Sequence, residues 1–205
     1  MELDELGGLV TKAVTPEPRE GNPPPRICET PAGMLNAIGL QNVGVEAFVS
    51  EKLPKLRAIG ATVIANVWGD LEDDYVTVVR ALEDAEGIAA IELNISCPNV
   101  RQGGMLFGNS PPLTRSLVAK VRAATRRPLI VKLSPNVTDI SLMARVAVDA
   151  SADAVSMINT VTGMAIDIKT RRPRLANITG GLSGPAVKPI AVRMVYEVYR
   201  SLKIP

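Results

Sequence analysis

Short apolar segments alternate with longer amphipathic segments along most of this chain, and this alternation limits the possible folds more than any other feature. The apolar segments, which we expect to form strands, cover residues 9–14, 62–67, 88–95, 128–134 and 154–158. The amphipathic segments, which we expect to form helices, cover residues 45–59, 73–85, 111–125, 138–150 and 186–202. Because the strands are almost continuously apolar, we expect about five βα units with a parallel sheet covered on its outer side by helices. Irregular loops are expected at 15–42 and 96–110, and a polar connection after residue 158.

Polar side chains stand out because they follow the ends of these predicted strands. Lys12, Asn66, Lys132 and Asn159 occupy such positions, and the segment 94–99 carries several more. In a (β/α)8 barrel the carboxyl ends of the strands converge on one face, where catalytic groups are found. A doubly wound dinucleotide-binding sheet is less favoured, since no G-x-G-x-x-G motif follows the first strand. The sequence therefore predicts an α/β fold of the TIM (β/α)8 barrel type.

The predicted barrel is expected to be incomplete. A full barrel takes roughly 250 residues, whereas this chain has 205. The pattern also holds too few strands to close a ring. We therefore expect residues 1–205 to form a single partial barrel domain with two open sheet edges, either a fragment of a longer protein or the product of a shortened reading frame.

The composition excludes several classes of function. With no histidine and two cysteines, the chain lacks the residues for a histidine-dependent triad, a histidine metal site or a thiolate cluster for zinc or iron–sulfur. A net charge of +2 is too small to indicate a nucleic-acid partner. No apolar run is long enough to span a membrane. The acidic N-terminus is unlike a signal peptide, so we expect a cytoplasmic protein with free thiols.

The turn after the strand at 88–95 is the strongest candidate for chemistry. The apolar strand ends there and is followed by amide, hydroxyl and thiol side chains in the sequence NISCPN at 94–99. Pro98 has no N–H and a fixed φ, so it cannot extend a central strand. Cys97 beside hydrogen-bonding amides is placed for reaction with a polar substrate. Taken alone, a cysteine is more often a small apolar residue, and that interpretation stays open here.

Ordered segments along the chain resemble those of class 1 dihydroorotate dehydrogenases. They are TK at 11–12, EPREGNPPPR at 17–26, NAIGLQN at 36–42, NISCPNV at 94–100, VKLSPN at 131–136 and INT at 158–160. Two more, GMAID at 163–167 and GGLSGPA at 180–186, resemble the B-type, NAD-linked catalytic subunit. The resemblance runs essentially from end to end.

The resemblance implies an FMN-containing barrel that oxidises dihydroorotate to orotate in pyrimidine biosynthesis. It implies that Cys97 removes a proton from the carbon next to a carbonyl, while hydride passes to the flavin. A thiol has an ordinary pKa near ~8.5 and must first lose its proton. We therefore expect activity to rise toward alkaline pH.

The same resemblance implies the binding residues. Contacts to the substrate are expected from Lys12, Asn36, Ala37, Ile38, Gly39, Leu40, Asn94, Asn159 and Thr160. Contacts to FMN are expected from Lys12, Ala13, Asn66, Asn94, Lys132, Ile158 and Gly184. Plainer interpretations stay open for three of them: an exposed strand-end lysine at 12, a turn asparagine at 36 and a solvent-reaching lysine at 132.

The resemblance also implies partners and leaves alternatives. It implies a homodimer that pairs with an electron-transfer subunit carrying FAD and an iron–sulfur cluster. The family's FMN phosphate site lies mostly in turns after the last two strands, which the sequence pattern lacks, so we expect the isolated chain to bind FMN poorly. The alternatives are an inactive truncated barrel that serves as a scaffold, and a dihydropyrimidine dehydrogenase-like domain, which shares the cysteine-bearing loop. The segments 36–42 and 163–167 favour the orotate enzyme.

Overall fold

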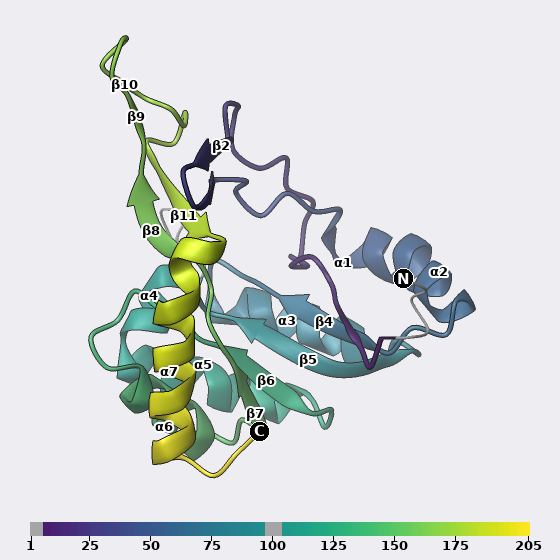
Figure 1. Ribbon diagram of the computed structural model, residues 1–205. Helices are drawn as coiled ribbons and strands as arrows, with labels where there is room; N and C mark the ends of the chain where they lie inside the picture. Colours follow the sequence, from purple (N-terminus) through teal and green to yellow (C-terminus); the bar gives the residue numbers. More distant parts are fainter. Residues whose placement is uncertain (1–5, 97–103) are drawn as a thin grey trace.

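The computed structural model describes residues 6–96 and 104–205, and its largest element is a curled parallel sheet (Figure 1). Its strand order is β1-β4-β5-β6-β7, and each neighbouring pair is parallel. The strands are β1 (Leu9–Val10), β4 (Val63–Val67), β5 (Ile88–Asn94), β6 (Leu129–Lys132) and β7 (Ala154–Ser156). The five predicted strands are confirmed, and together they form an open part of a barrel.

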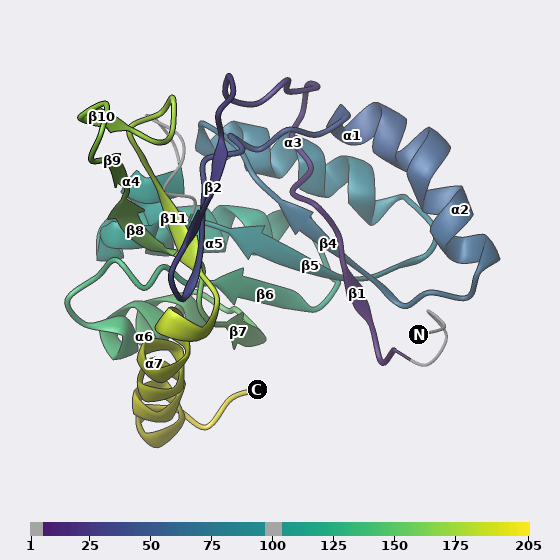
Figure 2. The same cartoon turned by 45° about the horizontal axis from the view of Figure 1, so that its top comes forward.

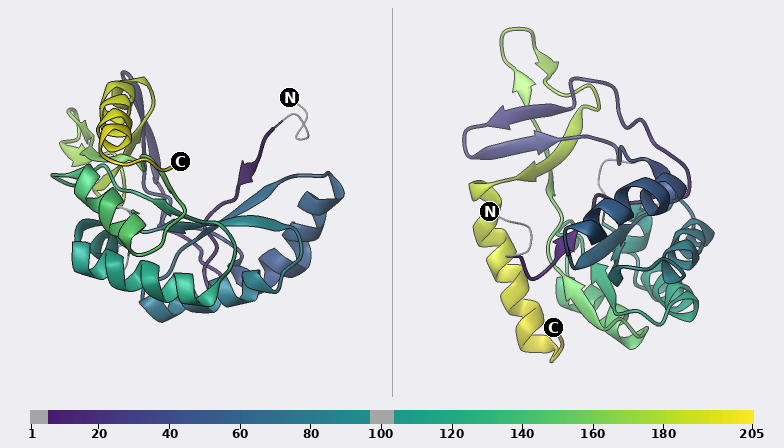
Figure 3. Two further views of the ribbon diagram at one scale, coloured as in Figure 1. Left: turned by 90° about the horizontal axis from the view of Figure 1, so that it is seen from below. Right: turned by 90° about the vertical axis from the view of Figure 1, so that its right-hand side faces the viewer.

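Helices connect the strands, and α2, α3, α5 and α6 cover the convex side of the sheet (Figure 3). The long helices are α3 (Glu72–Glu83), α5 (Pro111–Ala124), α6 (Ile140–Asp149) and α7 (Lys188–Ser201), the last preceded by the 3-10 helix η3 (Pro185–Val187). The helix predicted at 45–59 is a series of α1 (Gly44–Ala47), the π-helix η2 (Phe48–Lys52) and α2 (Leu53–Ala58). The π turn lies just before Pro54, which has no N–H to donate to an α-helical hydrogen bond.

Helix α3 shows how the sequence produces these elements. Tyr75, Val79 and Leu82 recur at the spacing of one helical face, and all three are fully buried. At the N-terminus of the helix, Asp74 accepts a hydrogen bond from the backbone N–H of Leu71. The buried face therefore packs on the sheet while the start of the helix is capped.

The carboxyl halves of the central strands differ on their two faces. Val67, Leu93 and Val131 are fully buried in the main apolar core. Between them, Asn66 and Asn94 carry polar side chains that point to the other face, because successive residues of a strand alternate. The concave face of the sheet thus becomes polar toward its carboxyl ends.

A second, antiparallel sheet lies at the carboxyl ends of the parallel strands, whose arrows point toward it (Figure 2). Its strand order is β2-β3-β11-β8. The strands are β2 (Ile27–Thr30), β3 (Gly33–Asn36), β8 (Val161–Met164) and β11 (Thr179–Ser183), and a two-stranded hairpin of β9 (Ile166–Asp167) and β10 (Arg172–Pro173) follows β8. This sheet brings Asn36, at the end of β3, over the parallel sheet.

The loop expected over 15–42 is therefore wrong in part, and the polar connection expected after 158 contains strands that the sequence analysis did not predict. Each segment contributes two strands to the second sheet, and β3 pairs with β11 from the far end of the chain. The strands are only four or five residues long, and three of them contain glycine, so no alternating pattern was readable. Their close packing explains one glycine, because a Cβ at Gly33 would lie 2.1 Å from the carbonyl oxygen of Ser183.

The loop expected over 96–110 is also wrong in part, because α4 (Gly104–Asn109) is helical. Phe107 of this helix is buried in the main core. A Cβ at Gly108 would lie 2.3 Å from the carbonyl oxygen of Ile95, so only glycine lets α4 approach the end of β5 this closely. Within residues 6–96 and 104–205, no helix is both long and apolar enough to cross a lipid bilayer.

Candidate active site at the carboxyl ends of the strands

A polar cavity of about 320 Å³ opens where the carboxyl ends of the parallel strands meet the second sheet. Most of the residues that the sequence predicted for substrate and cofactor line this one cavity. They are Lys12, Ala13, Asn36, Ile38, Gly39, Leu40, Asn66, Asn94, Lys132, Asn159 and Thr160. Val10 and Thr11, which were not predicted, complete the lining.

The remaining predicted residues lie elsewhere or outside the described part. Ala37 is fully buried in a small core under the second sheet, and Ile158 packs against the main core. Gly184 has φ +104°, and a Cβ on it would lie 2.8 Å from the Cα of Gly33, so the backbone crossing itself requires glycine. The roles of these three residues stay predictions. Cys97 lies outside the described residues.

A chain of hydrogen bonds runs across the strands beneath the cavity. The buried carboxylate of Glu92 on β5 accepts a hydrogen bond from Asn66 Nδ2 at 2.5 Å and one from Ser156 Oγ at 2.7 Å. Asn66 Oδ1 in turn accepts from Asn94 Nδ2 at 3.3 Å. Asn94 Oδ1 accepts from both the backbone N–H and the hydroxyl of Ser96.

The same chain continues to the segment after β7. Asn159 Nδ2 donates to Ser96 Oγ at 2.9 Å, and Asn159 Oδ1 accepts from the backbone N–H of Thr160 at 2.8 Å. The carbonyl of Thr160 accepts from Asn136 Nδ2 at 3.1 Å. Side chains from β4, β5 and the segments after β5, β6 and β7 are thereby held in one arrangement.

The sequence analysis missed Glu92, Ser96 and Ser156 as members of this network. The available signal was Glu92 itself, since a charged residue inside an apolar strand is rarely buried without partners. Its partners lie on β4 and β7, so only the tertiary structure identifies them.

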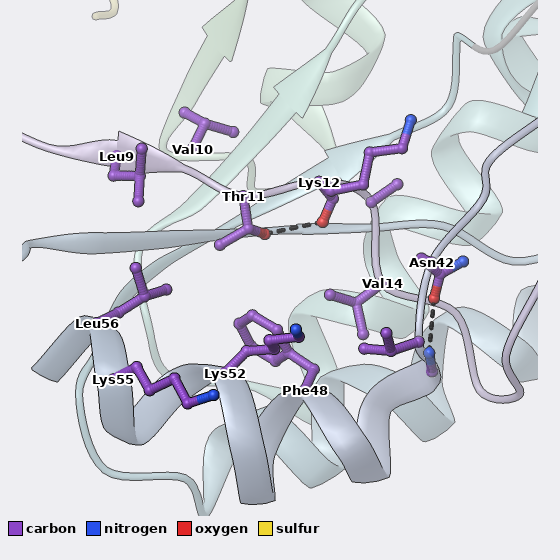
Figure 4. A pocket seen from close by; sticks show the side chains of 13 residues that line it. Leu9, Val10, Thr11, Lys12, Val14, Asn42, Phe48, Lys52, Lys55 and Leu56 are labelled. Carbon is purple, nitrogen blue, oxygen red and sulfur yellow. Dashed lines mark hydrogen bonds between the residues drawn. The ribbon is translucent and has the colours of Figure 1, made fainter. Parts of the chain in front are cut away.

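Two lysines line the cavity. Lys132, at the end of β6, is half-buried, and its ammonium makes no hydrogen bond or ion pair with any residue in the described ranges. Lys12 also lines an adjoining apolar hollow of about 500 Å³ between β1 and α2, where its side chain extends away from Phe48 and Lys52 (Figure 4). These two ammonium groups bring positive charge to the cavity, a property that suits an anionic or carbonyl-rich ligand.

Trp68 supports one wall of the cavity. It is fully buried and packs with Ala13 and Leu40, which themselves line the cavity. The Arg19 guanidinium lies 4.5 Å from the centre of the indole ring and is ion-paired with Asp70. Because Trp68 is the single tryptophan of the chain, its fluorescence reports on this wall.

The clearly shifted pKa values among the described residues belong to groups that do not line the cavity. A hydrogen bond from Lys120 on α5 lowers the pKa of Glu72 on α3, and the same bond raises the pKa of Lys120. Hydrogen bonds from Thr125 and from the backbone of Arg126 lower the pKa of Glu83. These groups join neighbouring helices and loops rather than serve the cavity.

Comparison with known proteins decides the family. A family model described as dihydroorotate dehydrogenase matches residues 1–205. The chain belongs to the dihydroorotate dehydrogenase family. Relatives from Pelobacter propionicus and Trichlorobacter lovleyi are 55% and 57% identical over 205 residues, and both are named dihydroorotate dehydrogenase B (NAD(+)), catalytic subunit.

The matches also define how much of the family's length is present. The alignments cover 100% of this chain and 67% of each of these two relatives. Among solved structures, DHODH from Eimeria tenella, in complex with ferulenol, superposes with a TM-score of 0.79 at 21% identity. That match covers 95% of this chain and 60% of the Eimeria chain, so it confirms the barrel fold and shows that this chain spans part of it.

Proposed function

We propose that this chain acts as the catalytic subunit of a dihydroorotate dehydrogenase, oxidising dihydroorotate to orotate with FMN. The observation that carries the proposal is the convergence of family-matched side chains on one cavity. Asn36 arrives from the second sheet, Asn66 and Asn94 from neighbouring parallel strands, and Lys132 and Asn159 from the strands beyond.

The chemistry of the cavity suits a pyrimidine. Orotate is a flat ring with alternating N–H and C=O groups and one carboxylate, and dihydroorotate carries the same polar groups on a ring with two saturated carbons. Amides such as Asn94 and Asn159 offer donors and acceptors to such a ring, and each unmatched buried polar group would cost roughly 1–3 kcal/mol. In the proposal, Asn36, Thr160 and the backbone of residues 37–40 complete these contacts, and the Lys12 ammonium faces the carboxylate.

The donor set also fits a flavin ring. The ammonium of half-buried Lys132 has no partner in residues 6–96 or 104–205, so an electron-rich or anionic group beside it would be stabilising. Lys132, Asn66 and Ala13 would hold the ring, with Lys12 and Asn94 between ring and substrate. When bound, FMN supplies the acceptor for the hydride. Ile158 and Gly184 remain proposed FMN contacts.

Cys97 is the proposed base. Ser96, the residue directly before it, is buried and hydrogen-bonded to Asn94 and Asn159. This holds the chain beside the cavity at the point where Cys97 follows. A thiolate there would take the proton from the substrate carbon, so activity should rise with pH toward the ordinary thiol pKa of about 8.5.

The proposal includes the setting of the enzyme. The name catalytic subunit, carried by the relatives, supports a second subunit that removes electrons, which we propose carries FAD and an iron–sulfur cluster. We further propose one FMN-binding barrel domain over residues 1–205, a homodimer and a cytoplasmic location.

The test is flavin reduction by substrate. The chain is mixed with excess FMN without oxygen, dihydroorotate is added, and loss of flavin absorbance is followed from pH 6 to pH 9. Replacing Cys97 by alanine should slow reduction about 10²–10⁴-fold, the usual contribution of a positioned base. Cys28→Ala, at the buried cysteine of the second sheet, is the matched control and should reduce flavin at the original rate.

Three outcomes would contradict the proposal. An undiminished rate in Cys97→Ala would exclude the cysteine as base. A preference for reducing uracil over oxidising dihydroorotate would favour the dihydropyrimidine dehydrogenase-like alternative. Because weak FMN binding is expected of this chain, only an absence of bleaching at high excess of both FMN and dihydroorotate would favour a non-catalytic scaffold.

A further inference from the structure

Glu92 is a buried carboxylate that the proposed reaction does not use. It lies on β5, the central strand of the parallel sheet (Figure 1). Of its surface, 4% is exposed. Within residues 6–96 and 104–205 it forms no ion pair, and its two oxygens accept from Asn66 Nδ2 and Ser156 Oγ. Burying a charge is costly unless it is well hydrogen-bonded, so this position calls for a reason.

The reason follows from what a carboxylate can do. An ionised carboxylate only accepts hydrogen bonds. Facing Glu92, Asn66 must therefore present its NH2 group, and this turns its Oδ1 toward Asn94. Asn94 then donates to Asn66, and its own Oδ1 faces Ser96, whose backbone N–H can only donate and favours the same orientation.

The donor–acceptor direction of the hydrogen bonds continues in the residues after β5. The Ser96 hydroxyl donates to Asn94, so its oxygen is left to accept from Asn159 Nδ2. Asn159 Oδ1 is then left to accept from the backbone N–H of Thr160. The side-chain amides of Asn66, Asn94 and Asn159 each use their oxygen and one N–H in this series of hydrogen bonds.

The second N–H of each amide is what remains for the cavity. Asn66, Asn94 and Asn159 all line it, and none has a second Nδ2 partner among the described residues. Together with the Lys132 ammonium, they make this side of the cavity a surface of donors. Such a surface selects the carbonyl and carboxylate oxygens of a ligand.

We propose that Glu92 is a positioning residue that fixes the hydrogen-bond direction of the cavity amides and thereby makes the cavity a receptor for ligand oxygens. The part that concerns orotate rests on the proposed function. The part that concerns amide direction stands on the hydrogen bonds alone.

Glu92→Gln tests the direction at constant size. A glutamine can donate as well as accept, so Asn66 is no longer forced to one orientation. In side-chain amide NMR spectra, we expect the Asn66 and Asn94 NH2 signals to shift and to broaden or double. Glu51→Gln, at an exposed glutamate, removes the same charge and should leave these signals unchanged.

The effect on ligand binding is tested by measuring orotate affinity through the fluorescence of Trp68. Glu92→Gln should weaken orotate binding about tenfold, the size of one hydrogen bond lost or misdirected. Glu51→Gln should bind as the original chain does. Altered amide signals in Glu92→Gln together with no orotate binding by the original chain would support the amide direction and overturn the proposed function.

If Glu92→Gln does not fold, hydrogen exchange in the original chain still tests the proposed role of Glu92. The Asn66 NH2 protons should exchange with solvent at least about tenfold more slowly than those of exposed Asn109, because one of them is bound to a buried carboxylate. Equal exchange at Asn66 and Asn109 would overturn the proposal. So would amide signals and orotate affinity that are the same in Glu92→Gln and the original chain.

Discussion

The carboxylate of Glu83 provides a sharp test of how α3 is attached to the rest of the fold. Glu83 is the last residue of α3, and its oxygens accept hydrogen bonds from the Thr125 hydroxyl and from the backbone N–H of Arg126. Arg127 Nε lies 3.6 Å from Glu83 Oε2. The side chain thus joins the end of α3 to the turn that leads into β6.

Replacing Glu83 by glutamine removes the charge and keeps the size. Hydrogen bonds to charged groups contribute about 1.5–3 kcal/mol and neutral ones about 0.5–1.5 kcal/mol, so Glu83→Gln should lower the free energy of unfolding at pH 7 by about 1–2 kcal/mol. The hydrogen bond from Thr125 is the main cause that lowers the pKa of Glu83 below its ordinary 4.5. A lowered folded-state pKa means that this stabilisation is present above about 4.5 and is lost as the pH falls through the folded-state value.

Urea unfolding followed by circular dichroism at pH 7, 5, 4 and 3 measures the difference. The gap between the original chain and Glu83→Gln should be widest at pH 7 and close toward pH 3. Glu51→Gln, at an exposed glutamate, should show no gap at any of these values. A gap of constant size, or none at pH 7, would refute the assignment of this stabilisation to the ionised carboxylate.

Two further substitutions test the core and the cavity. Leu93→Ala, at a fully buried position of β5, should lower the free energy of unfolding by about 2–5 kcal/mol in the same urea assay, and a loss below 1 kcal/mol would contradict tight packing there. Lys132→Met should leave stability within about 0.5 kcal/mol, because in the described ranges its ammonium bonds to nothing in the protein. Lys132→Met should nevertheless weaken the binding of orotate or FMN about tenfold, measured by Trp68 fluorescence. If the affinities for both ligands were unchanged, neither ligand would bind beside Lys132.

Much of the parallel sheet and of the cavity was predictable from sequence because the signals are local. The apolar face of α3 recurs at helical spacing, and the strands are short apolar segments between such helices. Once a barrel is inferred, residues after strand ends must meet, since the carboxyl ends of its strands share one face. Asn66, Lys132 and Asn159 could therefore be assigned to one site from their positions alone.

Other features depended on contacts between residues far apart in the chain. The second sheet joins β3 to β11, and no local pattern in these short, glycine-rich strands indicates that pairing. Glu92 carries no motif of its own, and its partners Asn66 and Ser156 come from other strands. Sequence by itself determined the parallel strands, the long helices and the shared position of the strand ends, because helix and strand periodicity are properties of neighbouring residues. Only the tertiary structure decided which strand ends pair and which way each amide points, because those depend on hydrogen bonds that exist only after the strands are side by side.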